Sequence, residues 1–497
     1  MRAAHAAGSC LAGGGRYWSE PAQLAGGAPL TARLMTSSFF MPSVRGCRTS
    51  LLVAAAILAG AGARTAHAAV VHRAHASAPS DSTKPKSRAA GADTARVAGP
   101  STRSDSAAAT TGAPPTATPV LDGAAIVAAL PFGISGMASA TLFAQDAAFG
   151  FGNGQNAVWA APSSVGEDRW LMGGDVRNTR LVVRASETAL GASANAWRAS
   201  AVVEMDFFGG FNGTGAFSDE QPQIRLRTVF ADLRRGRTTI RIGQAPTPSL
   251  GLTPVSPSHI AFPIGIGSAG VIGWREPGVF VTRTLSAVGA RTTVALQVAA
   301  FRGGWTGPGN VLDQQSAGEA GVPQLETRLD VGRAGRRATW SAYAVAHYDQ
   351  KDLSGIGPDT SGVGTLTGTA LTGGAKVTVG RYTLQGSGYH GRAIGQLFGQ
   401  LSQFGDIRGW GAWGQGGVAL TKRLSVWAMT GTDDPHDDDV RRAISGEARL
   451  ANVARAALVR YTAGPYTLGA EVLSARTTWT HASRRANQLA LSVIHAF

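Results

Sequence analysis

From residue 133 to the end of the chain, short segments alternate apolar side chains with small or polar ones. The clearest segment runs from Trp197 to Phe208. One of its faces carries Trp197, Ala199, Ala201, Val203, Met205 and Phe207, and the other carries Arg198, Ser200, Val202, Glu204, Asp206 and Phe208. A period of two residues is that of a β-strand whose two faces meet different surroundings. The connections between the segments alternate short and long, which is typical of a barrel that crosses a membrane.

The alternation predicts sixteen strands. They lie near residues 133–145, 178–187, 196–209, 223–234, 238–245, 278–285, 291–303, 326–332, 338–349, 371–380, 382–391, 409–421, 424–432, 449–460, 466–476 and 486–497. An even number of strands returns both ends to one side of the membrane and allows the sheet to close without a free edge. The predicted fold is therefore all-β: a 16-stranded antiparallel transmembrane β-barrel over residues 131–497, preceded by a disordered N-terminal segment.

The composition agrees with strands and excludes membrane-spanning helices. The chain has 66 Gly, only 15% charged residues and a mean hydropathy of +0.01. It contains no uninterrupted apolar run of the roughly 18 residues that a transmembrane helix needs. Any membrane span must therefore be made of strands.

The N-terminal residues have the pattern of a secretory signal peptide. Arg45 and Arg48 precede an apolar stretch from Leu51 to Ala63, and Ala66-His67-Ala68 forms a small-residue cleavage site. We therefore predict an upstream extension over residues 1–40, from a misassigned start codon, and a signal peptide over residues 41–68. Both cysteines, Cys10 and Cys47, lie before the cleavage site, so the mature chain has no disulfide and no Cys-based metal or catalytic site.

A stretch rich in Ala, Ser, Thr and Pro follows the cleavage site. It offers too little apolar surface to offset the entropy of ordering the chain. Residues 69–130 are therefore predicted to be a disordered periplasmic tether. The alternative is a segment that binds the cell wall.

The mature chain stays basic. Without the six bases and one acid of residues 1–68, it keeps 40 Lys and Arg against 30 Asp and Glu. Basic chains often bind nucleic acid, but an exported chain with no block of five Lys or Arg is not expected to do so. A basic channel interior accounts better for the excess.

The last predicted strand ends on an aromatic residue. Leu489, Leu491, Val493, His495 and the terminal Phe497 share one face. This pattern resembles the signal by which the barrel-assembly machinery recognises outer-membrane barrels. It therefore predicts the bacterial outer membrane as the location, with its lipid as a partner. The alternative is a soluble edge strand that happens to end in Phe.

Several short motifs occur together in the barrel region: Glu204-Met-Asp-Phe-Phe-Gly209, Arg225-Leu-Arg227, Gly243-Gln244, Arg275-Glu-Pro277, Asp433-Asp-Pro435, Glu471 and the strand from Asn487 to Phe497. In their order and spacing they resemble the DcaP-like trimeric porins. The resemblance implies a homotrimer and a preference for carboxylate or dicarboxylate solutes. That family carries a coiled-coil segment before the barrel, whereas residues 69–120 show no heptads.

Six arginines on the predicted lumen side would form a basic wall: Arg180, Arg184, Arg198, Arg225, Arg227 and Arg241. Arg184 and Arg198 lie equally far from Gly191 and are predicted to be cross-strand partners. Like charges that face one another favour an anionic visitor. The alternative for Arg225 and Arg227 is a structural network with the lumen acids Glu204 and Asp206.

The third outer loop, from Ala245 to about Trp274, contains no Asp, Glu, Lys or Arg. It contains instead these prolines and a histidine: Pro246, Pro248, Pro254, Pro257, Pro263 and His259. Because proline restricts the backbone, the loop is predicted to be a fixed constriction inside the pore. Arginines on the wall and no acids on the loop would favour small anions.

An acidic run is predicted to lie in the seventh outer loop. It consists of Asp433, Asp434, Asp437, Asp438 and Asp439. Its oxygens could bind Ca²⁺, although the spacing is not that of an EF-hand. The alternative is a solvated surface run. No other cofactor is predicted.

The predicted function is therefore a porin channel for passive diffusion of small anionic solutes, carboxylates or dicarboxylates. A structural or adhesive barrel without an open channel is the first alternative. A barrel enzyme is the second, but the sequence contains no nucleophile motif, and no catalytic residue is predicted.

Overall fold

The computed structural model describes residues 131–162, 170–209, 222–302, 323–352 and 365–497. The predicted upstream extension, signal peptide and tether, together covering residues 1–130, lie outside the described residues.

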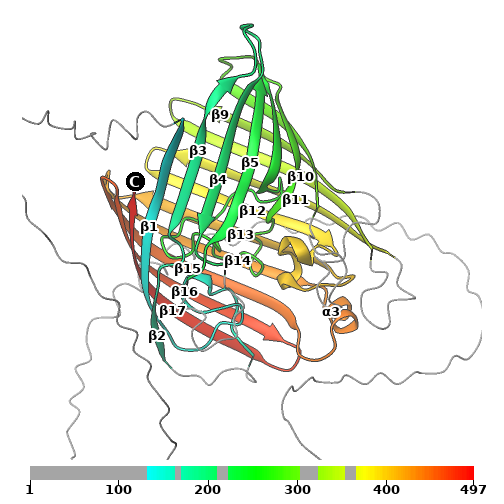
Figure 1. The fold of residues 1–497 in the computed structure, drawn as a ribbon. Helices are drawn as coiled ribbons and strands as arrows, with labels where there is room; N and C mark the ends of the chain where they lie inside the picture. Colours follow the sequence, from blue (N-terminus) through cyan, green and yellow to red (C-terminus); the bar gives the residue numbers. More distant parts are fainter. Residues whose placement is uncertain (1–130, 163–169, 210–221, 303–322, 353–364) are drawn as a thin grey trace, which may run out of the picture. The chain divides into compact units, whose positions relative to one another are not determined.

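The described chain is a closed antiparallel sheet (Figure 1). Its strands are β1 (Phe132–Gln145), β2 (Leu171–Asp175), β3 (Arg180–Ala189), β4 (Arg198–Asp206), β5 (Arg225–Arg235), β6 (Thr238–Pro246), β7 (Arg275–Thr284), β8 (Thr292–Phe301), β9 (Gln324–Ala334), β10 (Ala338–Asp352), β11 (Thr365–Val379), β12 (Tyr382–Arg392), β13 (Arg408–Ala419), β14 (Leu424–Pro435), β15 (Arg449–Ala463), β16 (Tyr466–Trp479) and β17 (Ser483–Ala496). Each of the sixteen predicted strands corresponds to one of these.

The additional short strand, β2, does not widen the barrel. It pairs with β1 along Thr141–Gln145, and β3 pairs with β1 along Phe132–Met137. β2 and β3 therefore share one position in the wall. β17 pairs with β1 from Met137↔Ala496 to Gln145↔Gln488 and closes the sheet. The predicted 16-stranded antiparallel transmembrane barrel is confirmed.

Helical segments of the described chain are short. Among the described residues they are η1 (Gly154–Asn156), η4 (Gly395–Leu397), η5 (Gln400–Ser402) and α3 (Asp437–Ala443). Within the described residues, no helix has the length and apolar character needed to cross a membrane.

The two faces of the wall differ as the alternation predicts. Outward positions carry large apolar side chains such as Leu142 and Leu371, which are 67% and 68% exposed. An apolar band of this kind is stable against lipid and not against water.

Inward positions pack against loops that fold into the barrel. Trp413, Met429 and Leu473, from three different strands, are buried together with Phe262 and Ile264 of the long connection between β6 and β7. The core of the molecule is therefore inside the barrel and joins this connection to the wall.

Candidate pore-lining site

The connection between β6 and β7, residues 247–274, crosses the interior of the barrel; we call it the inner loop. Its Ser249 N–H donates to Glu326 Oε2 on β9 at 2.7 Å, and its Val255 N–H donates to Gln415 Oε1 on β13 at 2.8 Å. Asn452 Nδ2 on β15 donates to the Ser268 carbonyl at 2.8 Å. Because β9 and β15 are six places apart in the sheet order, the loop must lie across the lumen.

Close packing fixes the inner loop against β13. Gly270 has a φ of +82°, and a Cβ at this position would lie 2.4 to 2.6 Å from backbone atoms of Ala412. Only glycine allows both that conformation and that approach.

The prolines and histidine of the predicted constriction fall at the start of the inner loop and along it. Pro246 is the exposed last residue of β6, whereas the other prolines and His259 are buried: Pro248, Pro254, Pro257 and Pro263. The Nδ1 atom of His259 lies 2.9 Å from Glu471 Oε1 on β16 and 2.8 Å from the Ser258 hydroxyl. Asn178 Nδ2 donates to the Ser258 carbonyl at 2.6 Å, and Asn178 Oδ1 accepts from the Ala261 N–H at 2.9 Å. This part of the loop is therefore anchored on β16 and on the connection between β2 and β3.

Three of the six predicted wall arginines meet the two predicted acids. Arg225 Nη2 lies 2.7 Å from Asp206 Oδ2, and Arg180 Nε lies 3.2 Å from Glu204 Oε1. Arg227 reaches both acids, with Nε 2.7 Å from Glu204 Oε1 and Nη1 2.5 Å from Asp206 Oδ2. The ion-pair network predicted as the alternative for Arg225 and Arg227 is therefore present, and Arg180 belongs to it.

A fourth arginine completes this cluster. Arg275, the first residue of β7, is within electrostatic reach of Arg180, Arg225 and Arg227. Its guanidinium lies 4.7 Å from the Trp274 ring centre, and it makes no ion pair with any residue that the structure describes. We call these four arginines, with Glu204 and Asp206, the arginine group.

The inner loop meets the arginine group through aromatic rings. The Arg225 guanidinium lies 5.0 Å from the centre of Phe262, 5.7 Å from that of Trp274 and 5.4 Å from that of Phe208 on the wall. Phe262 and Trp274 are stacked on each other, with centroids 5.7 Å apart. Cations and aromatic faces attract one another, so this contact holds loop and wall together.

The other three predicted wall arginines lie elsewhere. Arg198 pairs with Glu187 near the β3–β4 turn, and Arg241 pairs with Asp232, with its Nε atom 2.8 Å from Asp232 Oδ1. Arg184 is exposed. The predicted single wall of six arginines is therefore divided between the arginine group and separate positions nearer the short-turn end.

The predicted pairing of Arg184 with Arg198 is wrong. The structure places Arg184 opposite Val202 and Arg198 opposite Ala189. The turn is centred between Ser193 and Ala194 and not at Gly191, since the Leu190 N–H donates to the Trp197 carbonyl. A register shift between Ala185 and Thr188 displaces the two strands by one residue, and such irregularities leave no clear mark in an alternating sequence.

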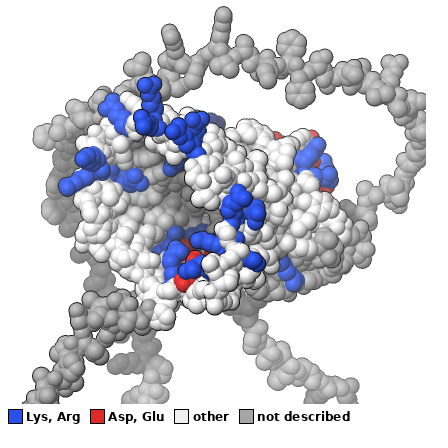
Figure 2. Space-filling view, turned by 90° about the horizontal axis from the view of Figure 1, so that it is seen from above, with Lys and Arg blue, Asp and Glu red and all other residues white. Residues whose placement is uncertain are grey.

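Charge gathers at the mouth of the barrel. Figure 2 shows many Lys and Arg side chains around the mouth, and a mixed group of basic and acidic side chains on one wall of the hollow.

The sequence pattern missed a second buried polar cluster. His347 Nδ1 lies 3.0 Å from Glu326 Oε1, and His347 Nε2 lies 3.3 Å from Asp349 Oδ2. Lys351 Nζ donates to Asp349 at 2.6 Å. The inward alternation of β10 could have indicated these positions, since all three β10 residues share one parity.

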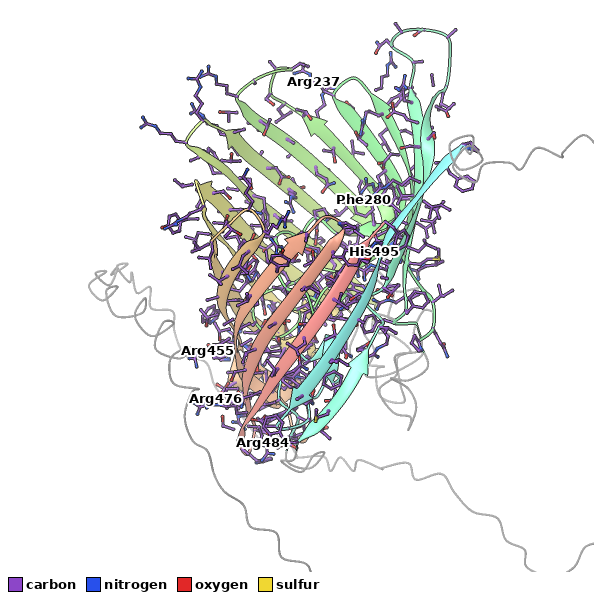
Figure 3. The ribbon with its side chains drawn as sticks, turned by 90° about the vertical axis from the view of Figure 1, so that its left-hand side faces the viewer. Arg237, Phe280, Arg455, Arg476, Arg484 and His495 are labelled. Atoms are coloured by element: carbon purple, nitrogen blue, oxygen red, sulfur yellow. The ribbon has the colours of Figure 1, made fainter. Side chains whose placement is uncertain are left out.

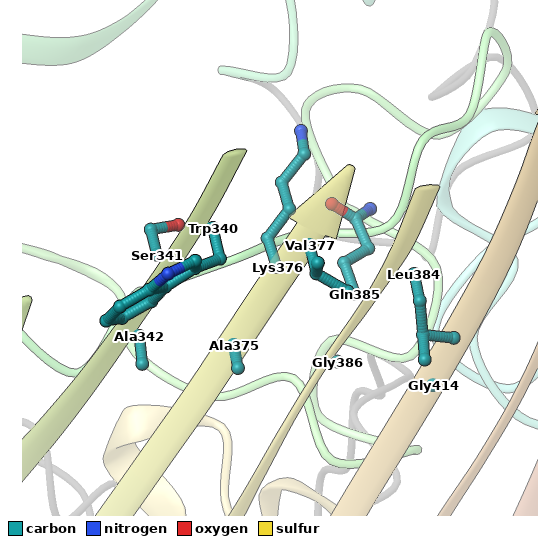
Figure 4. A pocket seen from close by; sticks show the side chains of 10 residues that line it. All are labelled: Trp340, Ser341, Ala342, Ala375, Lys376, Val377, Leu384, Gln385, Gly386 and Gly414. Carbon is teal, nitrogen blue, oxygen red and sulfur yellow. The ribbon is translucent and has the colours of Figure 1, made fainter. Parts of the chain in front are cut away.

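A shallow pocket of about 430 Å³ lies over β10, β11, β12 and β13 (Figure 4). Lys376 and Gln385 are cross-strand partners on the inward face, and the figure shows them pointing away from Ala375 and Leu384. Small residues, among them Gly386 and Gly414, leave the space between larger outward side chains. The pocket is thus mainly a depression on the membrane side and not part of the lumen.

The predicted calcium site is not formed, because the five aspartates point to different partners. Asp433 is buried and accepts from Tyr389 Oη at 2.8 Å and from the Leu401 N–H at 3.1 Å. Asp434 is next to it on β14 and faces the other side of the sheet, while Asp437, Asp438 and Asp439 form the first turn of α3. No group of three acidic or His side chains among the described residues could hold a metal.

Asp439 has a structural role instead. It accepts from Arg408 Nε at 2.7 Å and from Arg442 Nη1 at 3.1 Å. The hydrogen bond from Arg408 holds the pKa of the Asp439 carboxyl well below its usual range. The acidic side chain thereby ties α3 to the start of β13.

Comparison with known proteins gives the same architecture. The outer-membrane channel DcaP of Acinetobacter baumannii has a TM-score of 0.56 and 16% sequence identity, over 74% of this chain and 97% of that one. An anion-selective porin from Comamonas acidovorans has a TM-score of 0.48 and 13% identity, over 74% of this chain and 99% of that one. No protein-family model matches the sequence, and no curated protein does. The barrel thus has the fold of a bacterial outer-membrane porin, and in fold it agrees with the DcaP-like resemblance that the motifs indicate.

Proposed function

We propose that the chain is a porin of the bacterial outer membrane, through which small organic anions, carboxylates above all, diffuse passively. The observation that carries the proposal is the arginine group, which lies where the inner loop meets the wall. At this point guanidinium groups of the wall lie against aromatic rings of a loop that has no charged residue.

The charge balance of the arginine group favours anions. Four guanidinium groups face two carboxylates, which leaves two positive charges. In a narrow lumen with little water, an excess charge acts more strongly than in bulk solvent. The planar guanidinium also matches a carboxylate in bidentate fashion.

The aromatic rings beside the arginines favour an organic body on the anion. Phe262 and Trp274 present ring surface next to Arg225 and Arg275. A carboxylate with an apolar or aromatic part could place its charge on the guanidinium groups and its carbon skeleton on the rings.

The histidine in the inner loop does not support catalysis. In a Ser-His-acid triad the hydroxyl and the acid contact opposite ring nitrogens. Ser258 and Glu471 instead contact the same Nδ1 atom of His259. These contacts fit an anchor for the loop, and we propose no enzymatic activity.

Substitution of Arg275 tests the channel proposal most directly. Arg275→Gln removes a charge that is not paired within the described residues. Changing Arg241 would instead leave Asp232 without its partner. Changing Arg180 or Arg198 would break an ion pair to a carboxylate that a second arginine also contacts. We expect the anion preference, measured as the reversal potential across a planar bilayer with a salt gradient, to fall markedly. Arg275→Lys should retain most of it.

Arg184→Gln is the matched control, because it removes one exposed lumen-side charge outside the arginine group. The control should change selectivity much less. Unchanged selectivity in folded, conducting Arg275→Gln would contradict the proposed role of the arginine group.

A barrel without an open channel is the second candidate. The buried apolar cluster of the inner loop with Trp413, Met429 and Leu473 favours it, because such packing fills part of the interior. The same recordings separate the two: a protein that inserts into the bilayer but carries no current would favour the closed barrel.

We further propose a homotrimer, on the resemblance to trimeric porins. The mass of the detergent-solubilised protein by light scattering tests it, and a monomer mass would contradict it.

A further inference from the structure

Three arginines lie side by side on the outward face of the barrel: Arg455 on β15, Arg476 on β16 and Arg485 on β17. Arg476 is the direct cross-strand partner of Arg485. Arg455 is opposite Ser474, one outward position along β16 from Arg476. All three side chains are exposed. Figure 3 shows Arg455 and Arg476 near one end of the barrel, far from Arg237 at the other. We call them the outward arginine row.

No carboxylate on the outward face of these strands neutralises the positive charge of the outward arginine row. The outward positions of β15, β16 and β17 contain no Asp or Glu, and none of the three arginines makes an ion pair with a described residue. Asp146, at the adjoining end of β1, accepts from the N–H and the Nδ2 of Asn487, at 2.8 and 2.6 Å. Like charges in direct cross-strand positions destabilise a sheet unless an anion lies between them.

The row stands at the border of the apolar band. Val472 and Leu489, which are cross-strand partners 51% and 47% exposed, lie on the membrane side of Ser474 and Asn487. Arg455 lies level with Ser474, and Arg476 and Arg485 lie one outward position beyond this pair of polar residues, toward the end of the barrel opposite the short turns. Because short turns mark the periplasmic end of such barrels, this border faces the outer leaflet.

We propose that the outward arginine row binds the phosphate groups of a glycolipid headgroup in the outer leaflet. Guanidinium groups take phosphate oxygens in bidentate fashion, and an apolar surface directly below accommodates the acyl chains. The hydroxyl groups of Thr430 and Ser474, both directly opposite Arg455, add donors at the same level. This site is on the outside of the barrel and is independent of the channel.

The test uses the full barrel in nanodiscs of phosphatidylcholine, alone or with diphosphorylated lipid A. The test variant replaces Arg455, Arg476 and Arg485 by Gln. The matched control replaces Arg234, Arg235 and Arg237 by Gln, which removes two arginines from the end of β5 and one from the β5–β6 turn. We expect lipid A to bind the unaltered barrel and the control alike, as measured by native mass spectrometry. The test variant should lose about tenfold or more in affinity.

Further measurements distinguish lipid A from other molecules that could occupy the outward arginine row. Lipid A without phosphate groups should bind no better to the unaltered barrel than to the test variant. Equal lipid A binding by the test variant and the control would overturn the proposal. So would full displacement of lipid A by millimolar inorganic phosphate, which would point to a site for free anions. A test variant that binds lipid A normally but loses subunits would assign the row to contact with a second copy of this chain.

Discussion

At the residue scale, the hydrogen bonds of Asp439 predict how the stability of α3 depends on pH. Asp439 has a depressed pKa because it accepts hydrogen bonds from Arg408 and Arg442. The stabilisation from these bonds is present above the ordinary carboxyl pKa of about 4 and is lost only as the pH falls through the lower folded value. We expect α3 to stay protected against amide hydrogen exchange at pH 4, and Asp439→Asn to remove that protection at every pH. Asp438→Asn is the control, because that residue is exposed. Equal protection in both variants would show that Asp439 does not hold the helix.

Much of the arginine group could be predicted from residues alone. Period-two alternation, together with the family resemblance, led to Arg180, Arg225, Arg227, Glu204 and Asp206. Arg275 stands in a motif of the resemblance but is not predicted as a wall arginine, because the alternation places the start of the strand near residue 278 and the structure places it at Arg275. For the five aspartates the sequence prediction failed in the opposite way, because it grouped residues that the structure separates. Proximity in sequence suggested a shared ion, but the end of a strand and the start of a helix direct their carboxylates apart.

At the scale of elements, the fit of the inner loop against β13 can be broken at one glycine. Gly270→Ala should force the loop away from Ala412, because the new Cβ would overlap with backbone atoms. We expect a larger or noisier single-channel conductance from a barrel that remains heat-modifiable. Gly236→Ala is the matched control, with a φ of +55° and no atom within 4 Å of the added Cβ. It carries a similar backbone strain of about 1 kcal/mol without the clash. If both variants conduct like the unaltered protein, the inner loop does not restrict the pore.

The positions of the strands can be predicted from the sequence, because each strand repeats the same two-sided pattern. The register between neighbouring strands cannot. The short β2 escaped notice since its five residues include two glycines and no clear alternation. The register of β3 and β4 depends on the turn that Leu190 and Trp197 close and on an irregularity between Ala185 and Thr188. The contacts of the inner loop depend on residues from strands far along the chain, such as Glu326 and Asn452. Local sequence patterns do not predict such long-range contacts.

At the scale of the whole molecule, the barrel has to be exported before it can fold in a membrane. The signal-peptide pattern predicts cleavage after Ala68. N-terminal sequencing of the protein from the membrane fraction should therefore begin at Ala69. A start upstream of Met41 would contradict both the cleavage site and the reassigned start codon.

Closure of the barrel places Phe497 beside β1. The effect of this residue on assembly can therefore be distinguished from its effect on the stability of the closed sheet. The Phe497 N–H donates to the Gly136 carbonyl at 3.1 Å, and the Gly136 N–H donates to the Phe497 carbonyl at 2.9 Å. The Phe497 side chain is 58% exposed. Deleting the residue therefore removes two hydrogen bonds at the rim, worth about 1 to 3 kcal/mol together, from a sheet of many.

We expect a barrel without Phe497 that is refolded in detergent to melt close to the unaltered protein. We propose that Phe497 is the terminal aromatic signal for the assembly machinery. In cells, the amount of heat-modifiable barrel in the membrane should then fall several-fold. Phe497→Tyr keeps an aromatic end and should restore the membrane level. Normal membrane levels after the deletion would refute the assembly role, whereas a large loss of melting temperature in detergent would show that Phe497 acts through the stability of the closed sheet.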